Sequence, residues 1–167
     1  MIKVVKFGGS SLASAEQFQK VVEIIRKDPE RRFVIPSAPG KRSKDDTKVT
    51  DMLYACHAKA AAGEDFKEEL DAIRERYEAI IRGLSLELSL QGEFETIDCT
   101  LREGVGKDYA ASRGEYLNGI VMAAWLKYPF IDAAEVIFFD EKGNFDADRT
   151  NREVAARLAG EEYAVIP

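Results

Sequence analysis

The feature that most constrains this chain is the order strand, turn, helix, strand within its first forty residues. Residues 2–7 carry apolar side chains on both faces, which is typical of a buried strand in a parallel sheet. A Gly-Gly-Ser-Ser turn follows, then an amphipathic helix that Ser14 can cap, and then a second short strand at residues 33–35. A β-α-β unit of this kind favours a parallel sheet. We therefore expect residues 2–7 to form a central strand of that sheet.

The remainder of the chain continues the alternation of helices and strands. The fold class that it predicts is α/β, as a three-layer α/β/α arrangement with a largely parallel sheet. The polar segment 38–48 is expected to be a mobile loop, and residues 84–104 fit a strand or a helix equally well. Helices are expected at residues 50–62, 65–81, 107–127 and 150–158, and strands at residues 134–139 and 163–167.

Composition excludes several classes of protein. A chain of 167 residues fits one domain, and 30 acidic against 24 basic side chains give a net charge of −6, which argues against nucleic-acid or anionic-membrane binding. No apolar run approaches the roughly 20 residues that span a bilayer. Because the chain opens directly on a strand pattern, we expect no signal peptide. Cys56 and Cys99 are interpreted as buried small hydrophobes of a protein in a reducing cytoplasm.

The sharpest local motif is Lys6 followed by Gly8, Gly9 and Ser10. It stands at the carboxyl end of the first strand, the edge where open α/β sheets bind ligands. Successive backbone N–H groups beside two glycines can form a concavity for an anion, and a neighbouring ammonium group suits phosphoryl transfer. A solvated lysine before an ordinary glycine turn explains the same residues, and position alone leaves both interpretations open.

Three other groups are weaker candidates. Glu115 lies on an apolar helix, where its carboxylate could take the ammonium group of an amino acid, although a solvated glutamate is the simpler interpretation. Asp146 and Asp148 fit a polar turn better than a cation site, so no metal ligands are predicted. His57, alone among alanines, is interpreted as a surface or hydrogen-bonded core residue rather than a catalyst.

Taken together and in order, the motifs of this chain resemble those of aspartate kinases in the amino-acid kinase family. The resemblance covers essentially the whole chain, although the segment 38–48 is longer than in many relatives. The segments that carry it are Lys6-Phe7-Gly8-Gly9-Ser10-Ser11, Pro36-Ser37-Ala38, Val49-Thr50-Asp51-Met52-Leu53, Ser112-Arg113-Gly114-Glu115 and Phe145-Asp146-Ala147-Asp148.

The resemblance implies a reaction and a set of site residues. The reaction is phosphoryl transfer from MgATP to the side-chain carboxylate of L-aspartate, giving 4-phospho-L-aspartate, the first step in the biosynthesis of lysine and the other amino acids made from aspartate. Lys6 would contact the transferred phosphoryl group. Thr50 and Glu115 would bind aspartate, with Glu115 taking the α-ammonium group. Gly8, Gly9 and Ser10 would hold the phosphoryl group, and Ser37 would line the same pocket.

The resemblance also implies how the chain relates to a whole enzyme. Residues 1–167 would be the N-terminal portion of the catalytic domain, truncated before its second half and the regulatory domains, and inactive alone. The full-length enzyme would be a cytoplasmic homo-oligomer. Two alternatives stay open: another amino-acid kinase, of the glutamate or acetylglutamate type, and a non-catalytic binding or interaction module.

Overall fold

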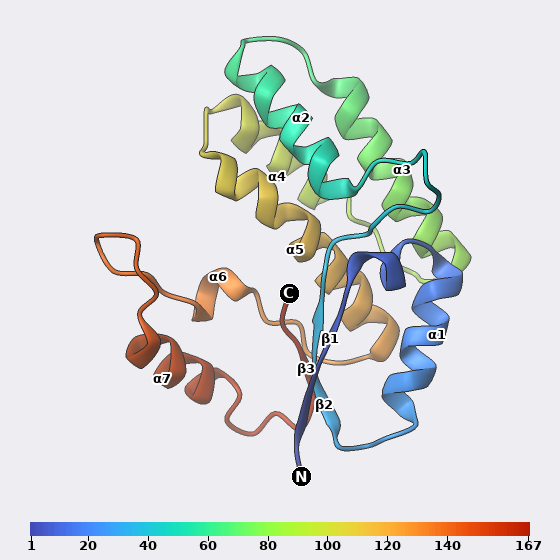
Figure 1. The fold of residues 1–167 in the computed structure, drawn as a ribbon, viewed down its shortest axis with the longest axis vertical. Coiled ribbons are helices and arrows are strands. Elements are labelled where there is room, and N and C mark those ends of the chain that lie inside the picture. Colours follow the sequence, from blue (N-terminus) through green and yellow to red (C-terminus); the bar gives the residue numbers. More distant parts are fainter.

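The computed structural model describes residues 1–167 as a three-stranded sheet surrounded by helices (Figure 1). All three strands are parallel, and their order in the sheet is β1-β2-β3. The elements are β1 (Lys3–Phe7), the short 3-10 helix η1 (Gly9–Leu12), α1 (Ala15–Arg26), β2 (Arg31–Pro36), α2 (Val49–Ala61), α3 (Lys67–Gly83), α4 (Gln91–Arg102), α5 (Lys107–Leu126), α6 (Ala133–Val136), α7 (Ala147–Arg157) and β3 (Ala164–Val165). The predicted α/β class with a parallel sheet is confirmed.

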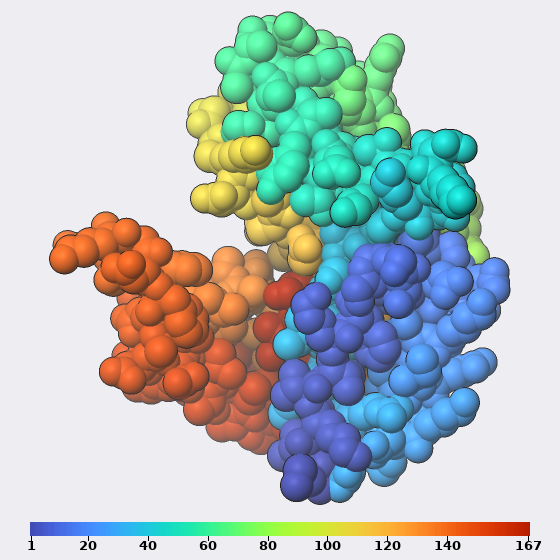
Figure 2. All heavy atoms as spheres, in the orientation of Figure 1, coloured from blue at the N-terminus to red at the C-terminus, as the bar shows by residue number.

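The position of the first strand was predicted wrongly. β1 pairs only with β2, so it is an edge strand of the sheet, and β2 is the central one. One face of β1 is also uncovered, since Val5 and Phe7 pack against the main core, whereas Ile2 and Val4 are 56% and 61% exposed. Figure 2 shows this strand, in dark blue, along the surface of the molecule.

The central strand β2 separates two apolar clusters, which gives the predicted three layers. Val34 is fully buried in the main core, together with residues of α1 and α5. Its neighbour Phe33 points to the opposite face, where it packs on a smaller cluster formed by Ile131, Val136 and Ala164. Alternation of side chains along a strand produces this division. Helices α6 and α7 stand on that second face (Figure 1).

Helix α1 follows the sequence prediction closely. Ser14 lies before it in an extended conformation, and its hydroxyl accepts a hydrogen bond from the backbone N–H of Gln17, 3.4 Å away. Such a cap stabilises a helix by about 1 kcal/mol. The predicted apolar stripe is buried over its whole length, at Phe18, Val21, Val22 and Ile25.

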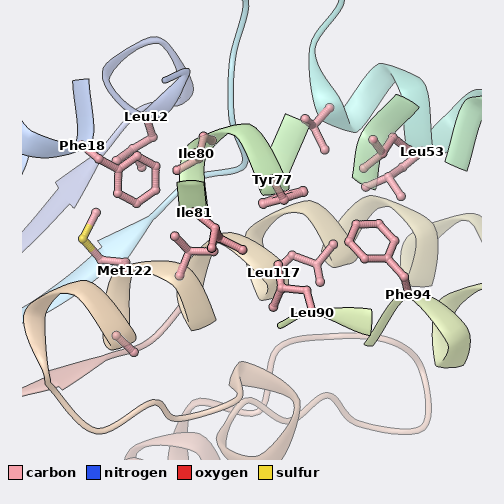
Figure 3. Packing of buried hydrophobic residues seen from close by; sticks show 14 of the residues in the cluster. Leu12, Phe18, Leu53, Tyr77, Ile80, Ile81, Leu90, Phe94, Leu117 and Met122 are labelled. Carbon is pink, nitrogen blue, oxygen red and sulfur yellow. The ribbon is translucent and has the colours of Figure 1, made fainter. Parts of the chain in front are cut away.

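Helices α2, α3 and α4 lie together beyond one end of the sheet, and α5 runs from this group back to the strands (Figure 1). Figure 3 shows the shared core, in which Tyr77 of α3 lies among side chains of α2, α4 and α5. The hydroxyl of Tyr77 donates to the carbonyl of Gly114, at 2.7 Å. Burial holds the pKa of Tyr77 well above its usual value, so the hydroxyl remains a donor.

The structure decides between strand and helix for residues 84–104 and corrects the strand predicted at residues 134–139. Residues 84–104 contain the helix α4 and no strand. Leu84 and Leu90 pack into the core from the non-helical connection before α4. The strand predicted at residues 134–139 is wrong: its first part is the short helix α6, which starts where Asp132 accepts a hydrogen bond from the N–H of Ala134. Phe139 then pairs with Phe145 in an isolated antiparallel bridge.

Two further expectations concern single features. No helix in the structure combines the length and the apolar character that crossing a membrane requires. Cys56 is fully buried, as predicted, but Cys99 is exposed, because it lies on the outer side of α4 beside Glu103. Both thiols are free.

Candidate active site

The turn that follows β1 lies at the carboxyl edge of the parallel sheet. Gly8 precedes η1 in an extended conformation, and the N–H of Ser11 donates to the Gly8 carbonyl at 3.0 Å. The fully buried Leu12 anchors the end of this turn in the core. Beside it, the N–H of Ser37 donates to the carbonyl of Phe7 at 3.0 Å, so the ends of β1 and β2 stay adjacent.

Lys6 and Ser37 meet at this edge. The Lys6 ammonium donates to the Ser37 hydroxyl, with 3.1 Å between Nζ and Oγ. Because that partner is a neutral hydroxyl, the positive charge of Lys6 remains available to an anion. The two strands bring these side chains together in register, since Lys6 pairs with Ile35 two residues before Ser37.

Asn118 supports this edge through the backbone of Ser37, a contact that the sequence did not predict. It lies on α5, is fully buried, and donates from Nδ2 to the carbonyl of Ser37 at 2.6 Å. Its amide thereby fixes the backbone of Ser37, while its Oδ1 is buried without a hydrogen-bond partner. The signal available in the sequence was an asparagine among the apolar residues of a helix, a position that favours a specific hydrogen bond.

The segment Ser112 to Glu115 has a structural reason for its glycine. A Cβ on Gly114 would lie 2.7 Å from the Cβ of Ala38, so only glycine lets α5 approach the end of β2 this closely. The approach brings Glu115, half-buried on the next position of α5, to the same edge of the sheet. Glu115 therefore comes to the end of β1 and β2 by close helix packing.

A cavity of about 450 Å³ joins these elements. Five of the seven residues predicted from the sequence line it, namely Gly9, Ser10, Ser37, Thr50 and Glu115. Lys6 and Gly8 are outside the lining, although Lys6 is one hydrogen bond away through Ser37. The lining also contains Lys41 and Lys48, for which the sequence predicted no role, together with Ala38, Pro39 and Gly40.

The chemistry of this cavity is polar and mostly cationic. Two lysines, two serines and a threonine can donate hydrogen bonds, and Glu115 is its one carboxylate. This combination suits a ligand that carries phosphate oxygens and an ammonium group. Glu115 also lines a second cavity, of about 350 Å³, which extends toward α6. The largest cavity, about 640 Å³ between α3 and residues 86–91, contains none of the predicted site residues.

The weaker candidates have ordinary structural roles. The carboxylate of Asp146 caps α7 by accepting from the N–H of Arg149, and Asp140 accepts from two N–H groups of its own turn. His57 makes a 3.0 Å hydrogen bond with the carbonyl of Val105. The chain has no group of three or more His, Cys, Asp or Glu side chains placed to hold a metal ion.

A parallel sheet with a lysine-rimmed polar cavity at its carboxyl edge is a feature of α/β domains that bind anionic ligands. Comparison with known families makes the class definite. The profile of the amino acid kinase family matches residues 1–165, and the chain belongs to that family.

Individual relatives are aspartate kinases. Aspartokinase 3 of Bacillus subtilis is 40% identical over 141 residues, which cover 81% of this chain and 31% of that protein. The crystal structure of Clostridium acetobutylicum aspartate kinase superposes with a TM-score of 0.95 at 45% identity, covering 98% of this chain and 38% of the other. This chain thus spans about a third of the length of the relatives that it matches.

A more distant structure has the same fold. E. coli aspartokinase III, solved in complex with aspartate and ADP, superposes with a TM-score of 0.77 at 22% identity. That alignment covers 99% of this chain and 40% of the E. coli chain.

Proposed function

We propose that residues 1–167 are the N-terminal portion of an aspartate kinase catalytic domain. The complete protein would transfer a phosphoryl group from ATP to the side-chain carboxylate of L-aspartate. The observation that carries this proposal is the single polar cavity that gathers Gly9, Ser10, Ser37, Thr50 and Glu115 beside Lys6. The 40% and 45% identities to aspartate kinases support the choice of aspartate over other acceptors.

In this mechanism the residues of the chain bind and orient the two reactants. The ammonium of Lys6 and the N–H groups of Gly8, Gly9 and Ser10 hold the transferred phosphoryl group. Their fixed positive charge matches the negative charge that spreads over the phosphoryl oxygens as the bond to the leaving ADP breaks. Glu115 accepts hydrogen bonds from the α-ammonium of aspartate, and the hydroxyl of Thr50 binds the same substrate.

The new bond between oxygen and phosphorus then forms in line with the bond that breaks. A carboxylate oxygen of aspartate attacks the γ-phosphorus, the bond from phosphorus to the bridging oxygen breaks, and ADP leaves. Holding both reactants in this geometry can contribute about 7–11 kcal/mol to lowering the barrier. Ser37 links the two halves of the site, because its hydroxyl accepts from Lys6 and its carbonyl is fixed by Asn118.

Mg²⁺ does not fit a site made by this chain alone. Glu115 is the only carboxylate in the cavity, and the ion prefers several oxygen ligands. The metal would therefore arrive with the ATP phosphates and take further ligands from outside these residues. A cytoplasmic location, a role in lysine biosynthesis and a homo-oligomeric state of the complete protein belong to the same proposal.

The direct test is an assay of the complete protein with ATP and candidate acceptors. Acyl phosphates react with hydroxylamine to give hydroxamates, so the product is trapped and identified by mass. We expect aspartyl hydroxamate from L-aspartate, and little product from L-glutamate or N-acetyl-L-glutamate. A preference for either of the latter would replace aspartate kinase by another amino-acid kinase, and ATP binding without any acceptor would favour a binding module.

A further inference from the structure

The segment between β2 and α2 has a contact that its polar sequence did not predict. The N–H of Gly40 donates to the carbonyl of Gly9 at 2.8 Å, which joins this loop to the turn after β1. A Cβ on Gly40 would lie 2.6 Å from the carbonyl carbon of Gly9, and a Cβ on Gly9 would lie 2.7 Å from the oxygen of Ala38. The two backbones are in direct contact, so the shape of the turn depends on where the loop lies.

A single buried side chain holds both ends of the loop. Arg76 of α3 is only 4% exposed, and its Nη2 donates to the carbonyl of Gly40 at 2.7 Å. Its Nη1 donates to the carbonyl of Thr47 at 2.9 Å. The planar guanidinium therefore bridges a residue near the start of the loop and one near its end, which a lysine ammonium could not do with the same geometry.

Asp46, within the loop, supplies the negative charge that pairs with Arg76. The carboxylate of Asp46 lies 3.2 Å from Nη1 of Arg76 and also accepts three hydrogen bonds from Arg42, at 2.9–3.0 Å, from its N–H, Nε and Nη2. A buried guanidinium without a counter-charge would be strongly destabilising. Asp46 thus allows Arg76 to stay buried, and Arg42 folds the middle of the loop around the same carboxylate.

The loop places two further cations at the candidate active site. Lys41 follows Gly40 directly, Lys48 follows Thr47 directly, and both line the cavity with Gly9 and Glu115. Each lysine is thus adjacent in sequence to one of the two carbonyls that Arg76 holds.

We propose that Arg76 is a positioning residue of the phosphate site: it closes the loop 38–48 on the Gly8-Gly9-Ser10 turn and keeps Lys41 and Lys48 at the cavity, where they bind phosphate oxygens of the nucleotide. The inference rests on the proposed kinase function. It gives the longer loop a role in nucleotide binding, separate from the aspartate contacts at Glu115. Thr50 is anchored mainly by its neighbour Val49, which is fully buried in the core and also donates its N–H to the loop carbonyl of Pro39 at 3.2 Å.

The test compares Arg76→Met, which keeps the volume and removes the charge, with Arg76→Lys and with Arg74→Met in the complete protein. Arg74 lies on the same helix, stacks on Phe94 and pairs with Asp71, so it is a matched control away from the loop. We expect Arg76→Met to lower kcat on the order of 10–100-fold and to raise the KM for MgATP, since small misplacements are costly in phosphoryl transfer. The KM for aspartate should change less than about twofold. Arg76→Lys should recover part of the loss, and Arg74→Met should match the wild type.

Limited trypsin digestion reports on the loop without depending on catalysis. Lys41, Arg42, Lys44 and Lys48 are cleavage sites within it. Inorganic tripolyphosphate should slow their cleavage in the wild type and in Arg74→Met, but not in Arg76→Met. If Arg76→Met does not fold by circular dichroism, Asp46→Asn replaces it, with the same expected directions and smaller losses.

The outcomes separate this inference from the proposed function. Arg76→Met with wild-type loop protection and a wild-type KM for MgATP would overturn the positioning role, even in an active aspartate kinase. An Arg76→Met variant in which only the KM for aspartate rises would also overturn the positioning role. If the wild type phosphorylates no acceptor, the proposed function fails, while the tripolyphosphate protection still decides whether Arg76 positions an anion site.

Discussion

At the scale of single residues, Lys6 is the group whose removal should affect chemistry most. Its charge matches the phosphoryl group in the transition state more than in the ground state, so Lys6→Ala should lower kcat of the complete protein on the order of 10²–10³-fold. The KM for aspartate should change little. Steady-state kinetics of the ADP released measures both quantities.

Lys3→Ala is the matched control for that prediction. Lys3 belongs to the same strand, but its ammonium pairs with Asp28 and Glu30 at the opposite end from the cavity. This variant should keep normal kinetics. Normal turnover of Lys6→Ala would show that the assignment of Lys6 is wrong.

Whereas Lys6 should affect kcat, Glu115 should affect the binding of the acceptor, aspartate. Glu115→Ala removes the carboxylate proposed to take the α-ammonium of aspartate, so the KM for aspartate should rise by at least about tenfold, as expected for the loss of a charge-assisted hydrogen bond. The KM for MgATP should stay near its original value. Asp108→Asn, in the first turn of the same helix, is the control, and equal effects of the two variants would contradict the assignment.

The two cysteines give a test of burial that needs no substrate. Cys56 is fully buried, and burial raises the pKa of its thiol to about 12. Cys99 is exposed, although the neighbouring Glu103 raises the pKa of its thiol. A disulfide reagent at neutral pH should therefore modify one thiol in the native chain, slowly, and two in denaturant. Cys99→Ser should abolish the native reaction, and fast modification of the remaining Cys56 thiol in that variant would show that α2 is not packed as described.

At this scale the sequence predicted the residues with distinctive chemistry and missed those that act through packing. Ser10, Thr50 and Glu115 could be proposed as site residues because their motifs occur in a known order, and all three line one cavity. Asn118 and Arg76 could not, since each is defined by backbone carbonyls far away in the sequence. Hydrogen bonds between a side chain and a distant carbonyl leave no spacing pattern to detect.

At the scale of elements, the loop 38–48, which was predicted to be mobile, makes hydrogen bonds and ion pairs with Arg76 and within itself. The hydrogen bonds from Arg42, followed by the charge of Arg76, hold the pKa of Asp46 well below its usual range. Because the folded pKa lies below the unfolded value of about 4, this stabilisation is fully present above about pH 4. It is lost as the pH falls through the folded value.

A comparison of the wild type with Asp46→Asn measures that contribution. The difference in free energy of unfolding, from urea titrations, should favour the wild type at pH 7 and shrink as the pH falls below about 4. Asp45→Asn is the control, because the neighbouring carboxylate is exposed on the same loop. A difference that stays constant over the acid range would mean that folding does not lower the pKa of Asp46.

The errors in predicting elements have a common cause, which is that local pattern does not say what covers a surface. The alternation in residues 134–139 fits a strand, but no strand of the sheet lies beside it, and Asp132 starts a helix there instead. Residues 2–7 are apolar on both faces, yet the second face of β1 has no helix over it. Helix α1 was predictable because its cap and its apolar stripe are both local.

At the scale of the whole molecule, the sequence predicted a parallel β-α-β core because apolar periodicity and turns determine it locally. The order of the strands could not be predicted, since β3 comes from the far end of the chain and pairs with β2. The approach of α5 to the end of β2 depends likewise on Gly114 meeting Ala38, a contact between residues distant in sequence.

We expect the chain of 167 residues, produced alone, to lack aspartate kinase activity. Its cavity is polar, with Ala38 and Pro39 as the only apolar side chains, whereas sites for a flat ring such as adenine are usually lined by apolar groups. Weak nucleotide binding removes the proximity that phosphoryl transfer needs. Calorimetric titration with MgATP and a hydroxamate assay should both give no signal. Product formed by the wild-type chain but not by the Lys6→Ala chain would contradict the prediction. A contaminating kinase would give product with both chains, so the comparison excludes it.

The same chain should associate with itself at high concentration. β1 is an edge strand with unpaired backbone groups, and Met1, Ile2 and Val4 expose apolar surface along it. An uncovered edge of this kind favours pairing with another chain. Sedimentation should show dimers or larger species as concentration rises, and Val4→Lys should shift the distribution toward monomer, because a charge on an exposed edge opposes pairing. A chain that stays monomeric at all concentrations would mean that the exposed strand is protected by its own twist and by Lys3 and Lys6, which flank Val4 and Val5 along β1.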